Sequence, residues 1–249
     1  MDTLSNTLRD TYVVKYSDCD ALYEMSVPKM LNLYEDIVGT HTAQMQIGME
    51  TVGQKYGVKW VVTKIIMKID KRPKVADVLQ VSTWPHKPGF VRFGRSGVFK
   101  DGDGGDCVKF YSDWCILDVK NNKLMKTSTL PSLITDYRTD KAVDKEEVKE
   151  SIAEYNYVYS KKTMFSDLDA NRHINNVVFA KFALDVFPLK VFDEKQIDYV
   201  ENEFLEQCFE GDTIDVYIKK IDEYNYSIVE KRGEKDVFRM YVCFKPRNI

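Results

Sequence analysis

Two stretches of the chain carry apolar residues at the spacing of a helix. The first follows Ser26, a residue type that caps helix starts, and Pro28, which is tolerated in a first turn. We expect this helix to run to about Gln46, with a shorter helix over 50–56. The second stretch runs from Val177 to Phe187 and has apolar residues three and four positions apart. This spacing predicts an amphipathic or largely buried helix.

Runs rich in β-branched and aromatic residues accompany both helices and predict strands. In the first half they cover 58–69, 78–84, 90–100 and 108–119, and in the second half 156–163, 196–205, 212–221, 225–232 and 236–245. The acidic, glycine-rich run Asp101–Asp106 predicts a hairpin turn. Because strands outnumber helices and follow one another directly, the pattern favours an α+β fold with antiparallel sheets, each wrapped around its helix.

Short stretches of sequence repeat together with this order of elements. Tyr16-Ser17-Asp18-Cys19-Asp20-Ala21 matches Phe165-Ser166-Asp167-Leu168-Asp169-Ala170 at a constant offset of 149 positions, and 77–81 resembles 212–216 further along. A repeat this long indicates duplicated domains rather than a solenoid, whose repeats span roughly 20 to 50 residues. We expect an N-terminal domain over 1–140, a polar linker over 141–155 and a C-terminal domain over 156–249.

Composition excludes several classes of protein. A chain of 249 residues with 44% hydrophobic and 30% charged residues is typical of soluble globular proteins. The net charge of −3 argues against a nucleic-acid binder that works through overall basicity. No stretch approaches the roughly 20 apolar residues of a membrane span, and the start lacks the pattern of a secretion signal. Five cysteines without metal-ligand spacing favour a reducing, cytoplasmic setting.

Polar chemistry is concentrated just before the second helix. Asp169, Asn171 and His173 stand at alternate positions and provide a carboxylate, an amide and an imidazole. Under the offset of 149, Asn171 and His173 correspond to Leu22 and Glu24, so only the C-terminal copy has the amide and the imidazole. Backbone N–H groups at a helix start favour negative charge. We therefore expect this loop to polarise a carbonyl group.

The run from Ser166 to Asn176, SDLDANRHINN, resembles the signature of acyl-acyl-carrier-protein thioesterases of plants and bacteria. The resemblance extends from about Thr11 to about Lys245. It implies tandem hot-dog domains, in which a curled antiparallel sheet surrounds a long helix. It also implies hydrolysis of fatty acyl-acyl carrier protein, which releases a free fatty acid and ends chain elongation in fatty acid biosynthesis. A shorter form of the motif occurs in acyl-CoA thioesterases, which are the nearest alternative.

The resemblance assigns catalytic roles to Asp169, Asn171 and His173. A glutamate that precedes a cysteine in plant members corresponds here to Gln207, which precedes Cys208. The adjacent Glu206 would point to the opposite face if this segment were a strand. Gln207 can only form hydrogen bonds, so we expect it to orient water or the carbonyl. The sequence leaves the general base open between Asp169 and His173.

Other residues of chemical interest have ordinary explanations. Cys208 could be a nucleophile beside a histidine and an asparagine, but a thiol in a strand is more often a small hydrophobe. His41 and His86 have no partner motif, and we expect them to be structural. The Asp101–Asp106 turn lacks the twelfth-position glutamate of a calcium loop, so we expect neither a metal nor a cofactor.

Two further alternatives follow from the motif. A dehydratase of the same fold is disfavoured, because the Asp-x-Asn-x-His arrangement does not resemble its usual acid–base pair. A non-catalytic acyl-binding module is favoured by Gln207 alone and opposed by the presence of all three motif residues.

The resemblance also suggests where substrate and partner bind. It implies that the first half shapes the acyl tunnel, with Met30, Leu33, Ile37 and Trp60 as candidate lining residues. An acidic acyl carrier protein requires a locally basic docking site. The candidates are Lys71-Arg72-Pro73-Lys74, Lys161-Lys162 with Arg172, and Lys87 with Arg92 and Arg95. Both a monomer and a homodimer are compatible with the sequence.

Overall fold

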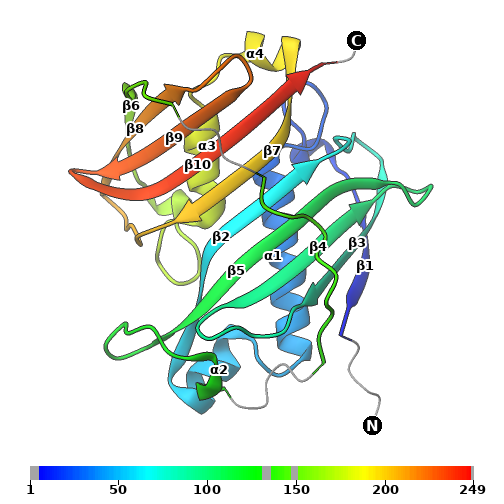
Figure 1. The fold of residues 1–249 in the computed structure, drawn as a ribbon, viewed down its shortest axis with the longest axis vertical. Helices are drawn as coiled ribbons and strands as arrows, with labels where there is room; N and C mark the ends of the chain where they lie inside the picture. Colours follow the sequence, from blue (N-terminus) through cyan, green and yellow to red (C-terminus); the bar gives the residue numbers. More distant parts are fainter. Residues whose placement is uncertain (1–5, 131–135, 147–150, 248–249) are drawn as a thin grey trace. The chain divides into compact units, whose positions relative to one another are not determined.

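The computed structural model describes residues 6–130, 136–146 and 151–247. It divides into two compact units, Met1–Asp144 and Lys145–Ile249, and each unit combines antiparallel strands with helices (Figure 1). This division falls inside the stretch 141–155 that we expected to connect the halves. Of that stretch, 147–150 lie outside the described residues.

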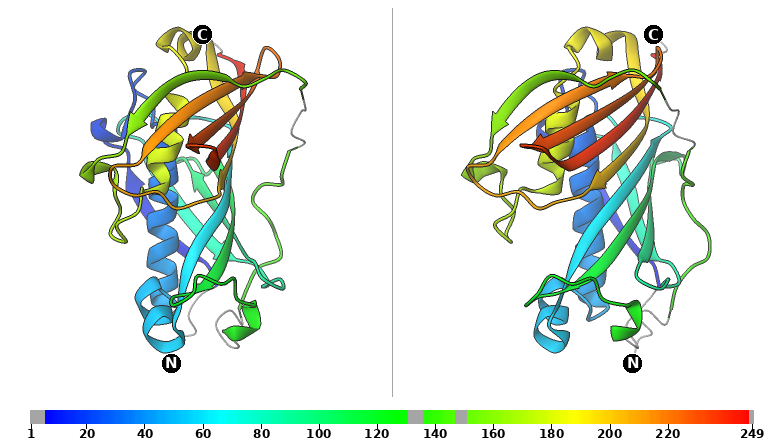
Figure 2. Two further views of the ribbon diagram at one scale, coloured as in Figure 1. Left: turned by 90° about the vertical axis from the view of Figure 1, so that its left-hand side faces the viewer. Right: turned by 60° about the vertical axis from the view of Figure 1, so that its left-hand side comes forward.

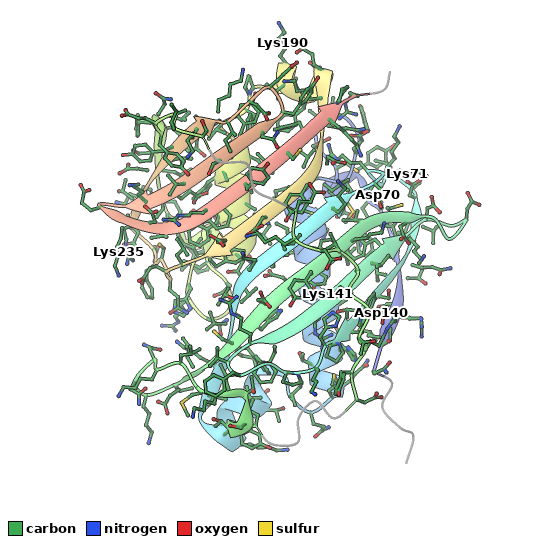
Figure 3. The ribbon with its side chains drawn as sticks, viewed as in Figure 1. Asp70, Lys71, Asp140, Lys141, Lys190 and Lys235 are labelled. Atoms are coloured by element: carbon green, nitrogen blue, oxygen red, sulfur yellow. The ribbon has the colours of Figure 1, made fainter. Side chains whose placement is uncertain are left out.

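The first unit places its strands in the order β1-β3-β4-β5-β2, with every neighbouring pair antiparallel. The strands are β1 (Leu8–Val13), β2 (Val58–Ile69), β3 (Val78–Pro85), β4 (Phe93–Lys100) and β5 (Asp106–Asp118), and the helices are α1 (Val27–Gln44) and α2 (Met49–Tyr56). The segment after β5 returns along the sheet, where Lys141 lies over the Tyr111 ring at 4.7 Å (Figure 3).

Helix α1 packs on one face of this sheet, as both views in Figure 2 show. The Tyr34 ring stacks on Phe110 of β5 with ring centroids 4.5 Å apart. The Tyr34 hydroxyl lies 2.7 Å from the Ser112 hydroxyl in the same strand. Gly97 of β4 permits this approach, because a Cβ there would lie 2.6 Å from a Tyr34 ring carbon. The Tyr34 ring therefore stacks on Phe110 of β5 and lies directly over the backbone of β4 at Gly97.

The second unit repeats the arrangement with the strand order β6-β8-β9-β10-β7, again antiparallel throughout. The elements are β6 (Asn156–Lys162), α3 (Asn176–Leu184), α4 (Leu189–Glu194), β7 (Lys195–Phe204), β8 (Thr213–Lys220), β9 (Asn225–Arg232) and β10 (Lys235–Pro246). Phe179 of α3 stacks on Phe238 of β10 at 5.5 Å, and the Tyr159 hydroxyl donates to the Phe182 carbonyl at 2.6 Å. These contacts seat α3 on its sheet.

Both units thus confirm the predicted α+β class and the tandem hot-dog architecture. The structure differs from the sequence expectation at the ends of elements. Strand β1 was not expected, and neither was α4. Strand β4 begins at Phe93 rather than residue 90, because Gly89 and Arg92 close a turn through an N–H···O bond of 2.8 Å. Helix α3 ends at Leu184 rather than Phe187, since Pro188 follows and cannot continue a helix.

Candidate functional site

Asp169 organises the loop that precedes α3. One of its carboxylate oxygens accepts the backbone N–H groups of Asn171 at 2.8 Å and His173 at 3.1 Å. The other oxygen accepts the Asn171 side-chain amide at 3.1 Å. The Asp169 backbone N–H donates to the His173 carbonyl at 2.8 Å, and Arg172 between them has a positive φ of 63°. The carboxylate therefore holds Asn171 and His173 in one tight turn.

The start of α3 is satisfied by its own residues. Asn175 is the N-cap, and its side-chain oxygen accepts the Val177 backbone N–H at 2.9 Å. The Asp167 side chain closes the preceding turn by accepting the Met164 N–H at 2.9 Å. Asn175 is thus a helix cap. The N–H group of Val177 is already bound by this cap, so it is not free to polarise a substrate carbonyl.

The imidazole of His173 is the third polar group of the motif. Its ring is half-buried and lies edge-on to Phe209, with ring centroids 5.1 Å apart and an interplanar angle of 64°. Within the described residues, neither ring nitrogen has a hydrogen-bond partner. By contrast, both carboxylate oxygens of Asp169 already accept N–H groups. The histidine is therefore the side chain of this turn that is available to exchange a proton.

A second loop, residues 205–211, lies against the motif. The Ile174 backbone N–H donates to the Cys208 carbonyl at 2.8 Å, which joins the two loops beside His173. Strand β7 ends at Phe204, so Glu206 and Gln207 lie in a loop and the alternation of a strand does not apply to them. The Glu206 carboxylate turns to Lys235, at 2.8 Å, near the tip of the β9–β10 hairpin (Figure 3).

The N-terminal copy repeats the backbone of the motif turn. Asp20 accepts the Leu22 N–H at 2.9 Å and donates its own N–H to the Glu24 carbonyl at 2.9 Å. Tyr23 has a positive φ of 59°, matching Arg172, and Ser26 caps α1 as Asn175 caps α3. Asp169 and His173 therefore occupy the positions that Asp20 and Glu24 occupy in the first copy.

Arg72 closes this turn in the first copy. Its guanidinium pairs with Asp20 at 2.5 Å and with Glu24 at 3.2 Å, and it donates to the Met25 carbonyl at 2.7 Å. The Arg72 side chain is only 4% exposed. In the first copy the two carboxylates of the turn are thus both paired with one buried arginine.

A second constant offset, of 135 positions, makes Arg72 the counterpart of Gln207. The Met25 N–H bonds the Pro73 carbonyl at 2.7 Å, as the Ile174 N–H bonds the Cys208 carbonyl. The matching of Asp77 with Asp212 carries the same offset and could have revealed this from the sequence. Arg72 contacts the counterparts of Asp169 and His173. Gln207 itself is exposed, and its backbone carbonyl accepts a hydrogen bond from Arg232 at 3.3 Å.

Cys208 has the environment of a structural thiol. It is fully buried, and burial raises the pKa of the Cys208 thiol to about 12. A thiol nucleophile requires a thiolate, which forms readily only when the pKa is depressed. Its chemical state at neutral pH is therefore the protonated thiol, in keeping with a small hydrophobe.

The first unit contains a pocket of about 380 Å³ between α1, α2 and the sheet. Aromatic side chains Trp60, Phe93 and Trp114 form part of its wall, and Glu35, Thr42 and Arg95 add polar groups. Of the expected tunnel residues, Trp60 lines this pocket. Met30, Leu33 and Ile37 are buried but do not line it.

Two of the three expected docking patches lose cations to burial. As whole residues Arg72 and Arg95 are 6% and 4% exposed, so neither can meet a partner protein. Lys71 and Arg92 pair with Asp101 and Asp113. The patch of Lys161, Lys162 and Arg172 keeps two exposed members, Lys162 and Arg172.

The remaining sequence candidates have structural surroundings. His41 accepts a hydrogen bond from Arg95 at 2.9 Å, and His86 contacts the Ser96 hydroxyl at 2.8 Å. Asp101 holds the predicted hairpin turn by accepting the Gly105 N–H at 2.8 Å. Among the described residues, no group of three or more His, Cys, Asp or Glu side chains could hold a metal ion. A helix long and apolar enough to cross a membrane is likewise absent from the described part of the chain.

Family models match both halves of the chain. The model described as the N-terminal domain of acyl-ACP thioesterases matches residues 5–129, and that of the C-terminal domain matches residues 154–239. Among sequence relatives, oleoyl-acyl carrier protein thioesterase 1 of Arabidopsis thaliana is 23% identical over 227 residues, covering 83% of this chain and 62% of the relative. The corresponding enzyme of Coriandrum sativum is 21% identical, with coverage of 83% and 61%. The chain thus spans about three fifths of these relatives.

Solved structures share the fold over nearly the whole chain. An acyl-ACP thioesterase from Bacteroides thetaiotaomicron has a TM-score of 0.86 and 20% identity, covering 96% of this chain and 98% of that one. The 12:0-ACP thioesterase from Umbellularia californica has a TM-score of 0.85 and 16% identity, with 98% of each chain covered.

Proposed function

Because the chain belongs to the acyl-ACP thioesterase family, we propose that it hydrolyses the thioester of fatty acyl-acyl carrier protein and releases a free fatty acid. Release of the acid ends chain elongation in fatty acid biosynthesis. The observation that carries the proposal is the open turn of Asp169, Asn171 and His173, set against a first copy that Arg72 closes.

In this mechanism His173 is the general base that activates water. Its ring nitrogens have no partner in the described part of the chain, whereas both carboxylate oxygens of Asp169 already accept N–H groups. Asp169 then acts as a positioning residue that fixes the turn. A neutral imidazole with a free ring nitrogen can accept a proton from water.

The amides supply polarity to the reacting carbonyl and the water. Asn171 uses one amide donor on Asp169, and the rest of its exposed amide can donate to the thioester oxygen. Gln207 orients the attacking water from the second loop. One well-aimed donor of this kind contributes about 2.7–4 kcal/mol to the transition state. The leaving carrier thiolate takes the proton that His173 removed from water.

In the proposed division of labour, the N-terminal half over 1–140 holds the acyl chain and the C-terminal half over 156–249 carries the catalytic residues. The pocket beside Trp60 is the acyl site. An acidic carrier protein docks at Lys162 and Arg172, and the setting is cytoplasmic, in keeping with five free cysteines.

The test is release of free fatty acid from a series of acyl-acyl carrier proteins, with acyl-CoA thioesters of the same chains assayed side by side. We expect His173→Ala and Asn171→Ala each to lower kcat/KM at least tenfold, in line with loss of a general base or one carbonyl donor. Ser166→Ala, an exposed change in the same motif, is the matched control and should retain activity.

Failure to release acid from either carrier would leave an acyl-binding module. Faster cleavage of CoA thioesters would favour the acyl-CoA alternative. Full activity in both the His173 and Asn171 variants would overturn the site assignment.

A further inference from the structure

The pocket beside Trp60, the proposed acyl site, contains a buried positive charge that no carboxylate of the described residues contacts as an ion pair. Arg95 of β4 lines the pocket and is 4% exposed. Its guanidinium donates to His41 Nδ1 at 2.9 Å and to the Thr83 hydroxyl at 3.2 Å, and it lies 3.8 Å from the Met45 sulfur. No carboxylate forms an ion pair with it in the described part of the chain.

The two hydrogen-bond partners of Arg95, His41 and Thr83, carry no negative charge, so they do not neutralise the guanidinium. An arginine only donates hydrogen bonds, so His41 Nδ1 must be the acceptor and the imidazole is uncharged. Burial lowers the pKa of Arg95 to about 10, which leaves the guanidinium protonated at neutral pH. A desolvated, uncompensated cation is costly, and such groups mark functional sites more often than packing needs.

A plain hydrocarbon chain is poorly matched to this wall. The aromatic side chains of Trp60, Phe93 and Trp114 suit methylene groups, but an alkyl segment against Arg95 would offer the buried guanidinium no hydrogen-bond acceptor. An oxygen atom at that depth would accept a charge-assisted hydrogen bond.

Resting on the proposed function, we propose that the enzyme prefers acyl chains that carry an oxygen remote from the thioester, and that Arg95 recognises that oxygen. In the proposed function the motif residues react with the thioester and the pocket holds the acyl chain, so the oxygen that Arg95 meets is a substituent of the acyl chain rather than the thioester oxygen. The class comprises hydroxy-, oxo- and carboxy-substituted acyl groups, which share the acceptor oxygen.

The first test is binding, which does not depend on turnover. Trp60 and Trp114 line the pocket, so their fluorescence reports ligand entry. Fatty acids of one length, unsubstituted or bearing a hydroxyl, oxo or carboxyl group toward the far end, are titrated against the full chain as esters of their C1 carboxyl group, so that this group cannot pair with Arg95. We expect at least one oxygenated class to bind roughly tenfold more tightly than the unsubstituted ester.

The second test is a set of variants read in the same titrations. Arg95→Met should abolish the preference, so that the ratio of the Kd values of the unsubstituted and oxygenated ligands falls to about one. Arg95→Lys, which keeps the positive charge, should restore part of the preference. Arg92→Met is the matched control, because that arginine is exposed and pairs with Asp113 at 3.2 Å.

The two proposals fail separately. If no acyl thioester is hydrolysed but the oxygenated ligands still bind better in an Arg95-dependent way, the pocket inference stands and the catalytic one falls. If unsubstituted acyl-carrier substrates are hydrolysed and the oxygenated ligands bind equally or more weakly, the inference about Arg95 is overturned. A preference that survives in Arg95→Met would also overturn it.

Discussion

The same position in two homologous turns can be structural or chemical, depending on which charges its neighbours supply. In the first copy, Glu24 faces Arg72 and the pair is consumed as a buried ion pair. In the second copy, His173 faces a loop whose counterpart of Arg72 is the uncharged Gln207. Where the first copy has Arg72 and Glu24 in an ion pair, the second has Gln207 and His173, and the imidazole is left without an ionic partner.

At Cys208 we expect substitution to have little catalytic effect. Burial raises the pKa of the Cys208 thiol to about 12, so almost no thiolate is present at neutral pH. Cys208→Ala should retain more than half of the wild-type kcat, with a small loss of thermal stability from the removed sulfur. The measurement is steady-state hydrolysis of acyl-carrier substrate beside a thermal melt. A nucleophilic cysteine would instead lose activity by several orders of magnitude in a variant that still folds.

Glu230 should make stability fall as pH rises. Both of its carboxylate oxygens are buried without a hydrogen-bond partner of good geometry in the described residues, and the effect of burial outweighs that of the nearby Ala183 N–H. Burial raises the pKa of Glu230 well above its usual range, so the folded state retains a proton that the unfolded state loses near pH 4. Stability conferred by the protonated group is therefore lost between the two pKa values.

Glu230→Gln removes this titration and keeps the shape. The variant's free energy of unfolding relative to wild type should increase steadily from pH 5 to pH 8 in urea titrations. Glu234→Gln, an exposed change in the adjacent hairpin turn, is the control and should show no such trend. A difference independent of pH would contradict the prediction. Glu230 lies between Val216 and Phe238 on the neighbouring strands. The equivalent residue of the first copy is Phe99, which lies between Val81 and Val108, so an apolar residue fits at this position of the sheet.

At the scale of elements, the packing of α1 depends on the absence of a side chain at Gly97. A Cβ there would lie 2.6 and 2.9 Å from two carbons of the Tyr34 ring. The ring cannot retreat easily, because it stacks on Phe110 and its hydroxyl contacts Ser112. Gly97→Ala should therefore lower the free energy of unfolding by about 1–3 kcal/mol.

Chemical denaturation measures this loss, and Gly102→Ala is its control. Gly102 lies in the β4–β5 turn with open space at the Cβ position, so its change should stay within about 0.5 kcal/mol. Equal stability of the two variants would mean that Tyr34 is less constrained than the packing indicates.

Most elements could be predicted from the sequence because each has a local cause. Ser26 and Asn175 cap the helices, and Asp101 builds the hairpin turn from its own side chain. Strand β1 has a mixed, largely exposed edge pattern, which carries no clear periodic signal. The offset of 149 would have predicted it, since β6 begins at Asn156, which corresponds to residue 7.

The candidate site was predictable only where its contacts are local in sequence. The motif residues are close in sequence, so their turn follows from local hydrogen bonds. Arg72 lies about 50 positions from Asp20 and Glu24, and its burial depends on how distant strands meet. Sequence reasoning therefore placed Arg72 and Arg95 in docking patches, although both are buried.

At the scale of the whole molecule, the chain and its proposed carrier partner are both acidic. A net charge of −3 gives no general attraction to an acidic protein, so association requires a local cationic surface. With Arg72 and Arg95 buried, the exposed Lys162 and Arg172 beside the motif are the cations that remain for this role in the catalytic half. Salt screens such exposed charges, with a Debye length of about 8 Å at physiological ionic strength.

We therefore expect kcat/KM for acyl-carrier substrate to fall with added salt more steeply than kcat/KM for an uncharged small thioester of the same acyl chain. Lys162→Glu should lower activity on the carrier substrate several-fold, flatten its salt dependence and leave the small thioester unaffected. Lys190→Glu is the matched control, because Lys190 is exposed on α4, beyond the other end of α3 from the motif (Figure 3). Equal salt sensitivity of both substrates, or equal effects of the two lysine variants, would show that carrier docking does not depend on this cationic surface.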